Sequence, residues 1–554
     1  MWILPTFLAF LLVPPSGTPR DPPGVRYRLR AVVDDIGRTV RGEGEVVYRH
    51  AGPASLATLT FSFAPSPTSG SPGERRFTIA GGDGPLAHDS SRARVALPHP
   101  LASGDSVVLR LTWESALPPN RHGNARGAIL ADWYPRVLDE VSGTTEPIAA
   151  IGAVQLDLDI AADQVVAASG VPVCGDPGWA AARRTPRVPL TLQRHWYRSA
   201  DTTVACTAPM GRKRVVWQAE SVTEFAAVMS PSFVYEEGDF LEKPVRALYE
   251  AGDERRWGTG LATQRLETAL AWTTELAGRY PWPHATVVQA GDGVARALPM
   301  LLVASDPGQG ALLDLLGLMI TQQMLPGSNR ALAVGAAAFE TAWFFEVLGR
   351  RDDYARLERT ILDWDLDELG RRIEPVPASR TGSPCATTFC RRTEFTYHQL
   401  RSWAGNDAVI AALFRAHFTE YQLRPAESGG FQRLAGNLVT PRPDTLYRQL
   451  PGGTVLYDDA VVAADRALGD DGRWRTTVVV ERQGEGVFPR VLWVVGEADT
   501  GVARLPSLAA RETVTVATAT RPRFVLLDPQ VRSHDWDMLD NQRVFGFRPA
   551  RLLL

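Results

Sequence analysis

The spacing of apolar residues changes twice along this 554-residue chain, and this change constrains the fold more than any other feature. From about residue 25 to 233, apolar and polar residues alternate in short runs between turn residues, as is typical of strands. From about 244 to 424 the apolar residues recur at helical spacing, and after 430 the alternation returns. The sequence therefore predicts a multidomain α+β protein. Its parts are an N-terminal antiparallel β-sandwich or saddle, a mainly helical domain and a small C-terminal β-sandwich.

Two segments of the helical region stand out by their composition. Residues 311–325 are apolar nearly all round, which predicts a buried helix. Residues 330–350 form a second expected helix, and its small residues would allow close packing between helices.

The expected divisions are a signal peptide over residues 1–20 and domains over 21–240, 241–430 and 431–554. The N-terminal apolar run is shorter than the roughly 20 residues of a transmembrane helix, which favours a secretory leader. It has no preceding Lys or Arg, so a misplaced start or a buried strand is the alternative. A leader would direct the protein to the periplasm, the cell envelope or the extracellular space, with no further membrane-spanning segment.

The balance of acidic and basic residues bears on whether the protein binds nucleic acid or membrane surfaces. Lys and Arg number 59 and Asp and Glu 62, a net charge of −3, which argues against binding to nucleic acid or to an anionic membrane surface. Nine His and four Cys leave few candidates for metal ligands in a chain of this length.

The four cysteines form two groups. Cys174 and Cys206 lie in the first β region, and Cys385 and Cys390 lie five residues apart in a loop. All four are disulfide candidates in an oxidising compartment. The alternatives are reduced thiols, or a metal site made by Cys385 and Cys390 with His398 and His417, although this spacing matches no compact zinc module well.

Several segments, in their order along the chain, are similar to a known family. They are ADWYPRV around Trp133 to Pro135, VVAASG ending at Gly170, SVTEFAAVMSPSF from Ser221, RYPWPHATVV around Tyr280 to Pro283, and a C-terminal stretch with Trp474. Together they resemble the aminopeptidase N-like zinc metallopeptidases of the gluzincin clan. The resemblance implies a thermolysin-like fold for the helical domain and zinc as the family's cofactor.

The family's zinc motif is absent from this sequence. Family members carry H-E-x-x-H on one helix and a ligating Glu on the next, whereas residues 312–345 contain no His or Cys. When GLMITQQMLPG is matched to the first helix, the ligand positions become Leu318 and Gln322, and the general base becomes Met319. The third ligand position, on the second helix, becomes Val334. We therefore expect no zinc and no other cofactor.

The positions that the resemblance assigns to substrate contacts are also changed. The family's Glu that holds the substrate's free amine is matched by Ala297 in GVARALPM, and the neighbouring Arg296 adds a charge that would repel an ammonium group. The family's oxyanion-stabilising Tyr is matched by Tyr397 in EFTYHQL, which has an ordinary helical tyrosine as its alternative interpretation.

Three hypotheses for function follow. The favoured one is a homologue without catalytic residues that binds peptides or acts as a scaffold in the cell envelope, and hence is not an enzyme. The second is an active metallopeptidase with a relocated metal site, built from His398, His417 and Glu394 or from Cys385 and Cys390. The third is a subunit that stabilises or regulates an active paralogue.

Overall fold

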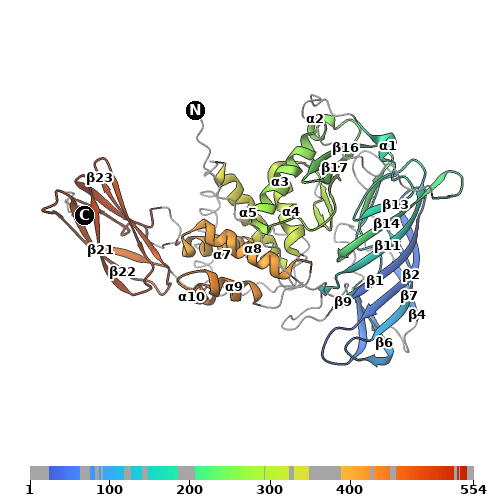
Figure 1. The fold of residues 1–554 in the computed structure, drawn as a ribbon, viewed down its shortest axis with the longest axis horizontal. Helices are drawn as coiled ribbons and strands as arrows, with labels where there is room; N and C mark the ends of the chain where they lie inside the picture. The colour runs from blue at the N-terminus through green and yellow to red at the C-terminus, as the bar shows by residue number, and fades with distance from the viewer. Residues whose placement is uncertain are drawn as a thin grey trace, which may run out of the picture.

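The computed structural model describes most of the chain after residue 23. The described residues are 24–62, 75–80, 87–88, 92–117, 126–139, 148–184, 206–291, 294–322, 330–348, 388–423, 429–449, 457–529, 533, 535 and 537–545. The expected signal peptide over 1–20, a strand expected over 187–192 and a helix expected over 352–372 lie outside these residues. The described parts form an elongated molecule with β-sheets at both ends and helices between them (Figure 1).

A seven-stranded sheet forms the largest part of the N-terminal region. Its strand order is β13-β14-β11-β1-β2-β7-β4. The strands are β1 (Val25–Val33), β2 (Thr39–Arg49), β4 (Arg75–Ala80), β7 (Ser106–Ala116), β11 (Gly152–Ala161), β13 (Val171–Cys174) and β14 (Arg212–Val222). Every second residue of β1 is buried, as the alternating pattern predicts. The sheet is not wholly antiparallel as expected, because β1 pairs in parallel with β11, which the chain reaches only after forming several other strands.

Two smaller sheets complete the N-terminal β region. One has the order β10-β9-β3-β6-β5 and the other β12-β15-β8. Their strands are β3 (Leu56–Ser62), β5 (Ala87–His88), β6 (Arg92–Leu101), β8 (Ala128–Leu130), β9 (Arg136–Asp139), β10 (Ile148–Ala149), β12 (Val165–Ala168) and β15 (Ala227–Ser230). A short helix, α1 (Trp179–Ala182), precedes residues that the structure does not describe.

A mixed five-stranded sheet lies between the N-terminal sheets and the helices. Its order is β16-β17-β18-β20-β19. The strands are β16 (Phe233–Phe240), β17 (Lys243–Glu250), β18 (Ala285–Gln289), β19 (Arg296–Leu298) and β20 (Leu301–Ala304). Because β16 and β17 form a hairpin in which Phe240 pairs with Lys243, the boundary predicted at 240–241 falls at the turn of this hairpin.

In the described residues, the helices expected over 311–325 and 330–350 are present as α4 and α5, and a later one is interrupted. The return to strands expected after residue 430 is wrong in its position, because two more helices follow and the first C-terminal strand begins at Asp459. The helices are α2 (Glu254–Trp257), α3 (Leu261–Ala277), α4 (Gln309–Gln322), α5 (Arg330–Val347), α7 (Thr388–Ala404), α8 (Asp407–Tyr421), α9 (Gly430–Leu438) and α10 (Asp444–Gln449). The helical pattern that reads continuously across α7 and α8 is broken at Gly405, which has a φ of 61°. Asn406 then caps α8, since its side chain accepts a hydrogen bond of 2.9 Å from the backbone N–H of Ala408.

The C-terminal region is a two-sheet sandwich. One sheet has the order β21-β22-β25 and the other β24-β23-β26-β27. The strands are β21 (Asp459–Leu468), β22 (Trp474–Arg482), β23 (Arg490–Gly496), β24 (Thr500–Leu505), β25 (Arg511–Thr518), β26 (Pro522–Leu527) and β27 (Gln542–Val544). Nine buried residues from Val461 to Leu527 form its own apolar core, separate from the core that the N-terminal sheets and the helices share.

One expected disulfide is present. Cys174 and Cys206 are bonded, with their Cα atoms 5.6 Å apart, which lies within the usual range for disulfides. Cys385 and the side chain of Cys390 lie outside the described residues, so the second expected pair stays a prediction. Among the described helices, none combines the length and apolar character that crossing a membrane requires.

Candidate functional site

The residues matched to the family's zinc ligands lie on α4 and α5, which pack closely against each other. A Cβ atom added to Gly317 of α4 would lie only 3.1 Å from the Cβ of Ala337 of α5. Next to this contact, the hydroxyl of Thr321 donates to the carbonyl of Gly317 at 2.8 Å and lies 3.3 Å from the carbonyl of Ala333. The small residues of α5 therefore serve the close helix packing that their composition predicts.

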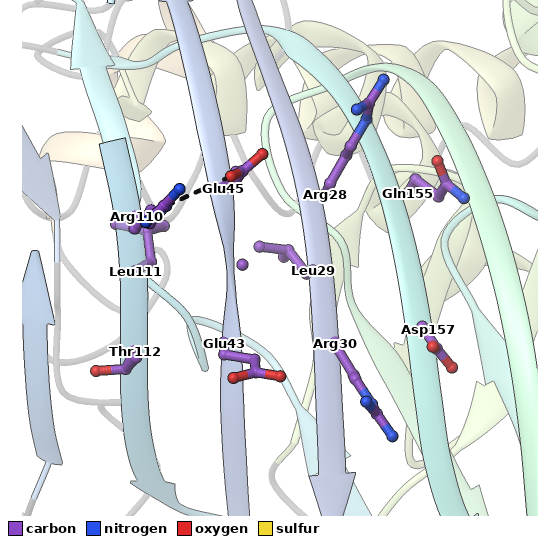
Figure 2. A pocket seen from close by; sticks show the side chains of 11 residues that line it. Arg28, Leu29, Arg30, Glu43, Glu45, Arg110, Leu111, Thr112, Gln155 and Asp157 are labelled. Carbon is purple, nitrogen blue, oxygen red and sulfur yellow. Dashed lines mark ion pairs between the residues drawn. The ribbon is translucent and has the colours of Figure 1, made fainter. Parts of the chain in front are cut away.

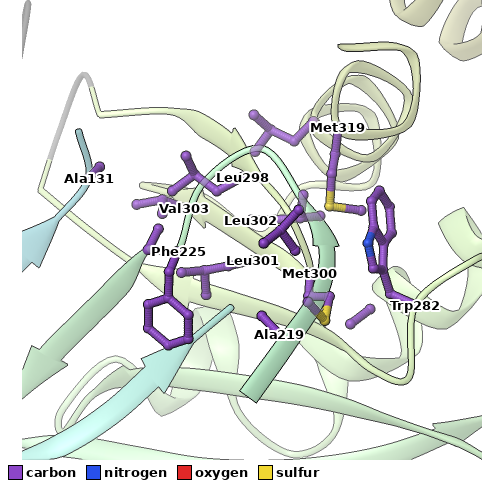
Figure 3. Close-up of a cluster of buried hydrophobic side chains, with 14 of the residues drawn as sticks. Ala131, Ala219, Phe225, Trp282, Leu298, Met300, Leu301, Leu302, Val303 and Met319 are labelled. Atoms are coloured by element: carbon purple, nitrogen blue, oxygen red, sulfur yellow. The ribbon is translucent and has the colours of Figure 1, made fainter. Parts of the chain in front are cut away.

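Met319, the residue matched to the general base, is part of an apolar cluster. Its side chain is 1% exposed and lies with Trp282, Leu298 and Met300 (Figure 3). This cluster joins α4 to β19 and β20 and to the chain segment before β18. A general base at this position would be a carboxylate surrounded by hydrocarbon, an environment that strongly disfavours charge.

The other matched positions supply no evident metal donors. Leu318 and Val334 are half-buried, and hydrocarbon side chains have no atom that can ligate zinc. Gln322 ends α4, and its side chain lies outside the described residues. The donor set that zinc requires, three nitrogen, sulfur or oxygen ligands, does not fit these residues.

Glu340 is a buried acid in the same helix pair. It is 2% exposed, and its Oε1 atom is buried without a hydrogen-bond partner. Its Oε2 atom lies 3.3 Å from the Cβ position of Gly317, at the α4–α5 contact. Burial raises the pKa of Glu340 to about 8, so the side chain is mostly protonated at neutral pH. In the sequence Glu340 is only one acid of an expected helix, and the pattern does not reveal its burial.

Tyr397 lies in an aromatic cluster on α7. Its ring centroid lies 5.9 Å from that of Phe339, 5.8 Å from that of Phe414 and 5.5 Å from that of Phe431. Burial raises the pKa of Tyr397 well above its usual value, and the nearby Glu340 raises it further. A neutral phenol packed among aromatic rings suits the interpretation of Tyr397 as a structural tyrosine.

The proposed relocated metal site is not assembled in the part of the chain that the structure describes. His398 lies with its Nε2 atom 3.9 Å from the carboxylate of Glu394, and its ring packs edge-on against Phe339. His417 packs instead against Phe431, and burial lowers its pKa to about 4. Neither histidine belongs to a described group of three or more His, Cys, Asp or Glu side chains whose ligand atoms lie close together.

Ala297, the residue matched to the amine-holding Glu, lies on β19 beside a buried ion-pair network. Arg296 donates to Asp132 at 3.2 Å, and Arg136 pairs with Asp132 and with Glu224. Among the described residues this network pairs two cations with two carboxylates, so Asp132 offsets the charge of Arg296. This pairing offsets the charge on which the expected repulsion of an ammonium group rests, and the sequence could not reveal it because Asp132 lies far away along the chain.

A separate hollow of about 440 Å³ lies on the seven-stranded sheet (Figure 2). Arginines and acids from neighbouring strands alternate across it: Arg28, Arg30 and Arg110 face Glu43, Glu45 and Asp157. Arg110 lies 3.6 Å from Glu45, for example. The hollow therefore has no excess of either charge.

Comparisons with known proteins give a match at the level of structure only. No protein-family model and no curated protein matches the sequence. Among solved structures, a variant of a two-domain M1 zinc metallopeptidase bound to L-tryptophan is 15% identical, with 78% of this chain and 95% of that chain covered and a TM-score of 0.54. The M1 zinc metallopeptidase from Deinococcus radiodurans is 14% identical, with 78% and 94% covered and a TM-score of 0.54. Identities this low establish the fold alone, and over the 78% of this chain that is covered the fold is similar to that of the M1 zinc metallopeptidases.

Proposed function

We propose that this protein is a homologue of the M1 peptidases that has lost its zinc site, and that it binds a peptide or protein instead of hydrolysing it. The observation that carries the proposal is the burial of Met319 among Trp282, Leu298 and Met300, at the position that the sequence match assigns to the general base. With Leu318 and Val334 at two ligand positions, a zinc ion would lack the protein donors that hold it.

The packing around Met319 explains how the helix pair can be stable without metal. Polar zinc ligands in a domain core are costly to bury when no metal binds them. Apolar side chains in their place contribute to folding instead, at roughly 1.5–3 kcal/mol for each one that is fully buried. This reasoning favours a site that has become part of the core over a site disabled by one substitution.

The location that we propose is the cell envelope or the extracellular space. The Cys174–Cys206 disulfide supports an oxidising compartment, and the expected signal peptide gives a route for export. A role beside an active paralogue is compatible with this location.

Zinc analysis and peptide hydrolysis test the loss of the site. We expect the purified full chain to contain substoichiometric zinc and to show no chelator-sensitive turnover of aminoacyl fluorogenic substrates. One tightly bound zinc ion per chain, with turnover that a chelator abolishes, would contradict the proposal.

Two variants separate the proposal from the relocated-site hypothesis. His398→Ala removes a candidate ligand of the relocated site, while Met319→Leu keeps the apolar cluster at similar volume. Turnover that is lost in His398→Ala and kept in Met319→Leu would favour the relocated site. Saturable binding of labelled peptides without their cleavage is the result that we expect for the binding function.

A further inference from the structure

Three aspartates from distant parts of the sequence meet at one corner of the C-terminal sandwich. Asp458 directly precedes β21, whereas Asp535 and Asp540 lie in the segment before β27. One carboxylate oxygen from each lies within 4.8 Å of the other two. Among the described residues, no other group of His, Cys, Asp or Glu side chains meets this condition.

Among the described residues, no basic side chain compensates the charge of this cluster. None of the three aspartates forms an ion pair with Arg or Lys in the described part of the chain. The nearby Arg490 forms an ion pair with Asp459, at an N–O distance of 2.7 Å. The Oδ1 atoms of Asp458 and Asp540 are buried and have no hydrogen-bond partner.

An amide oxygen adds a fourth donor of the same kind. Asn541 is 5% exposed, and its side chain hydrogen-bonds to the carboxylate of Asp535. The amide group is thus held within the cluster, while its Oδ1 atom is buried without a partner. A buried amide oxygen without a partner is costly, and a cation among the carboxylates would satisfy it.

Backbone hydrogen bonds hold the carboxylate of Asp535 and the main chain at Asp540 in place. Asp535 accepts the N–H of Asp459 at 3.0 Å and that of Asp537 at 3.1 Å, and its backbone bridges to Tyr457. The carbonyl of Asp540 accepts the N–H of Val461 at 3.0 Å. The framework of the sandwich therefore positions the Asp535 carboxylate and the main chain from which Asp540 projects.

We propose that Asp458, Asp535, Asp540 and Asn541 bind a calcium ion that fastens the segment before β27 to the start of β21. Three carboxylates and an amide oxygen are hard ligands, which suit Ca²⁺ and not Zn²⁺. Water molecules would complete the six to eight ligands that Ca²⁺ takes. Ca²⁺ tolerates varied arrangements of its ligands, whereas Mg²⁺ requires a nearly ideal octahedron.

Calcium binding to the full-length chain tests the proposal. The protein is stripped with a chelator, and Ca²⁺ is titrated by calorimetry and by thermal unfolding at pH 7.5, with Mg²⁺ and with sodium chloride of equal ionic strength as comparisons. We expect one Ca²⁺ per chain and a saturable rise of the Tm that Mg²⁺ reproduces weakly and sodium chloride does not. Asp540→Asn should weaken Ca²⁺ binding by at least about tenfold, a change of about 1.4 kcal/mol.

The matched control is Asp471→Asn, an exposed acid paired with Arg475 in the same sandwich, which should leave Ca²⁺ binding unchanged. If Asp540→Asn does not fold, terbium luminescence of the unaltered protein gives the answer, since Ca²⁺ should displace a single bound Tb³⁺. A Tm that Ca²⁺ does not change, equal Ca²⁺ binding by both variants, or terbium that Ca²⁺ fails to displace would overturn the proposal. A further contradicting result would be an Asp540→Asn variant that is more stable than the unaltered protein while neither protein responds to Ca²⁺. The carboxylates would then be held together by protons and not by a cation.

Discussion

Glu340 combines deep burial with an ionisable group at the contact between α4 and α5. Burial alone raises its pKa to about 8, from an ordinary value of 4.5. Between these two pH values the folded protein keeps a proton that the unfolded chain has released. The contribution of Glu340 to the free energy of unfolding is therefore largest below pH 4.5, and it falls as the pH rises towards 8.

This titration gives a prediction for Glu340→Gln. The unaltered protein should lose unfolding free energy relative to the Glu340→Gln variant as the pH rises from 5 to 8, because only the unaltered protein has an acid to ionise at this position. The slope should reach at most about 1.4 kcal/mol per pH unit. Urea unfolding of both proteins at several pH values measures it, with the exposed Glu275→Gln as the control that should show no such slope. Parallel curves for Glu340→Gln and the unaltered protein would mean that Glu340 is ionised in the fold.

At single residues, the sequence predicts apolar character but does not predict which distant side chains meet. The apolar character of residues 318 and 319 is readable from the sequence, and the burial of Met319 agrees with it. The pairing of Arg296 with Asp132 is not readable, because the two are 164 residues apart and meet only through the packing of separate sheets. The same holds for Asp458 and Asp535, which no spacing rule connects.

At the scale of elements, the contact between α4 and α5 depends on residues without side-chain bulk. The Cβ position of Gly317 already lies 3.1 Å from Ala337, closer than most packed carbon atoms. Gly310, at the start of α4, has only the ring of Phe345 at 3.4 Å from its Cβ position. The two glycines of one helix therefore differ in the space available to a side chain.

We predict that Gly317→Val destabilises the protein by about 1–3 kcal/mol, because its branched side chain would force α4 and α5 apart. Gly310→Ala, in contrast, should be neutral or stabilising by up to about 1 kcal/mol, since alanine favours helix. Equilibrium unfolding in urea distinguishes the two. Equal effects of the two substitutions would show that the helices do not approach closely at Gly317.

The elements were largely predictable and their pairing was not. Periodicity locates α4, α5 and the strands β22, β23, β25 and β26, because one buried face leaves a regular pattern. The break between α7 and α8 escaped the helical pattern, although Gly405 and Asn406 are typical end and start signals. The parallel pairing of β1 with β11 depends on long-range topology, about which local alternation carries no information.

For the molecule as a whole, the Cys174–Cys206 disulfide is the one covalent link among the described residues beyond the backbone. It closes a loop with a sequence separation of 32 residues between β13 and the segment before β14. In the chain-entropy model a loop of this length restricts the unfolded state by roughly 3–4 kcal/mol.

We therefore expect the double variant Cys174→Ser and Cys206→Ser to lose about 3–4 kcal/mol of unfolding free energy in the first urea transition. A reductant added to the unaltered protein should cause a similar loss, and it should have no effect on the double variant. If the reductant leaves the unaltered protein unchanged, the two cysteines are not bonded in solution.

The separate core of the C-terminal sandwich has an evolutionary consequence. The N-terminal sheets and the helices share one continuous set of buried residues, so neither can be exchanged without repacking the other. The sandwich buries nine residues of its own, but Phe488, between β22 and β23, belongs to the shared set and packs against Trp403 of α7. Exchange of the sandwich as a module would therefore require repacking around Phe488, whereas exchange of either preceding region would require repacking of most of the shared set.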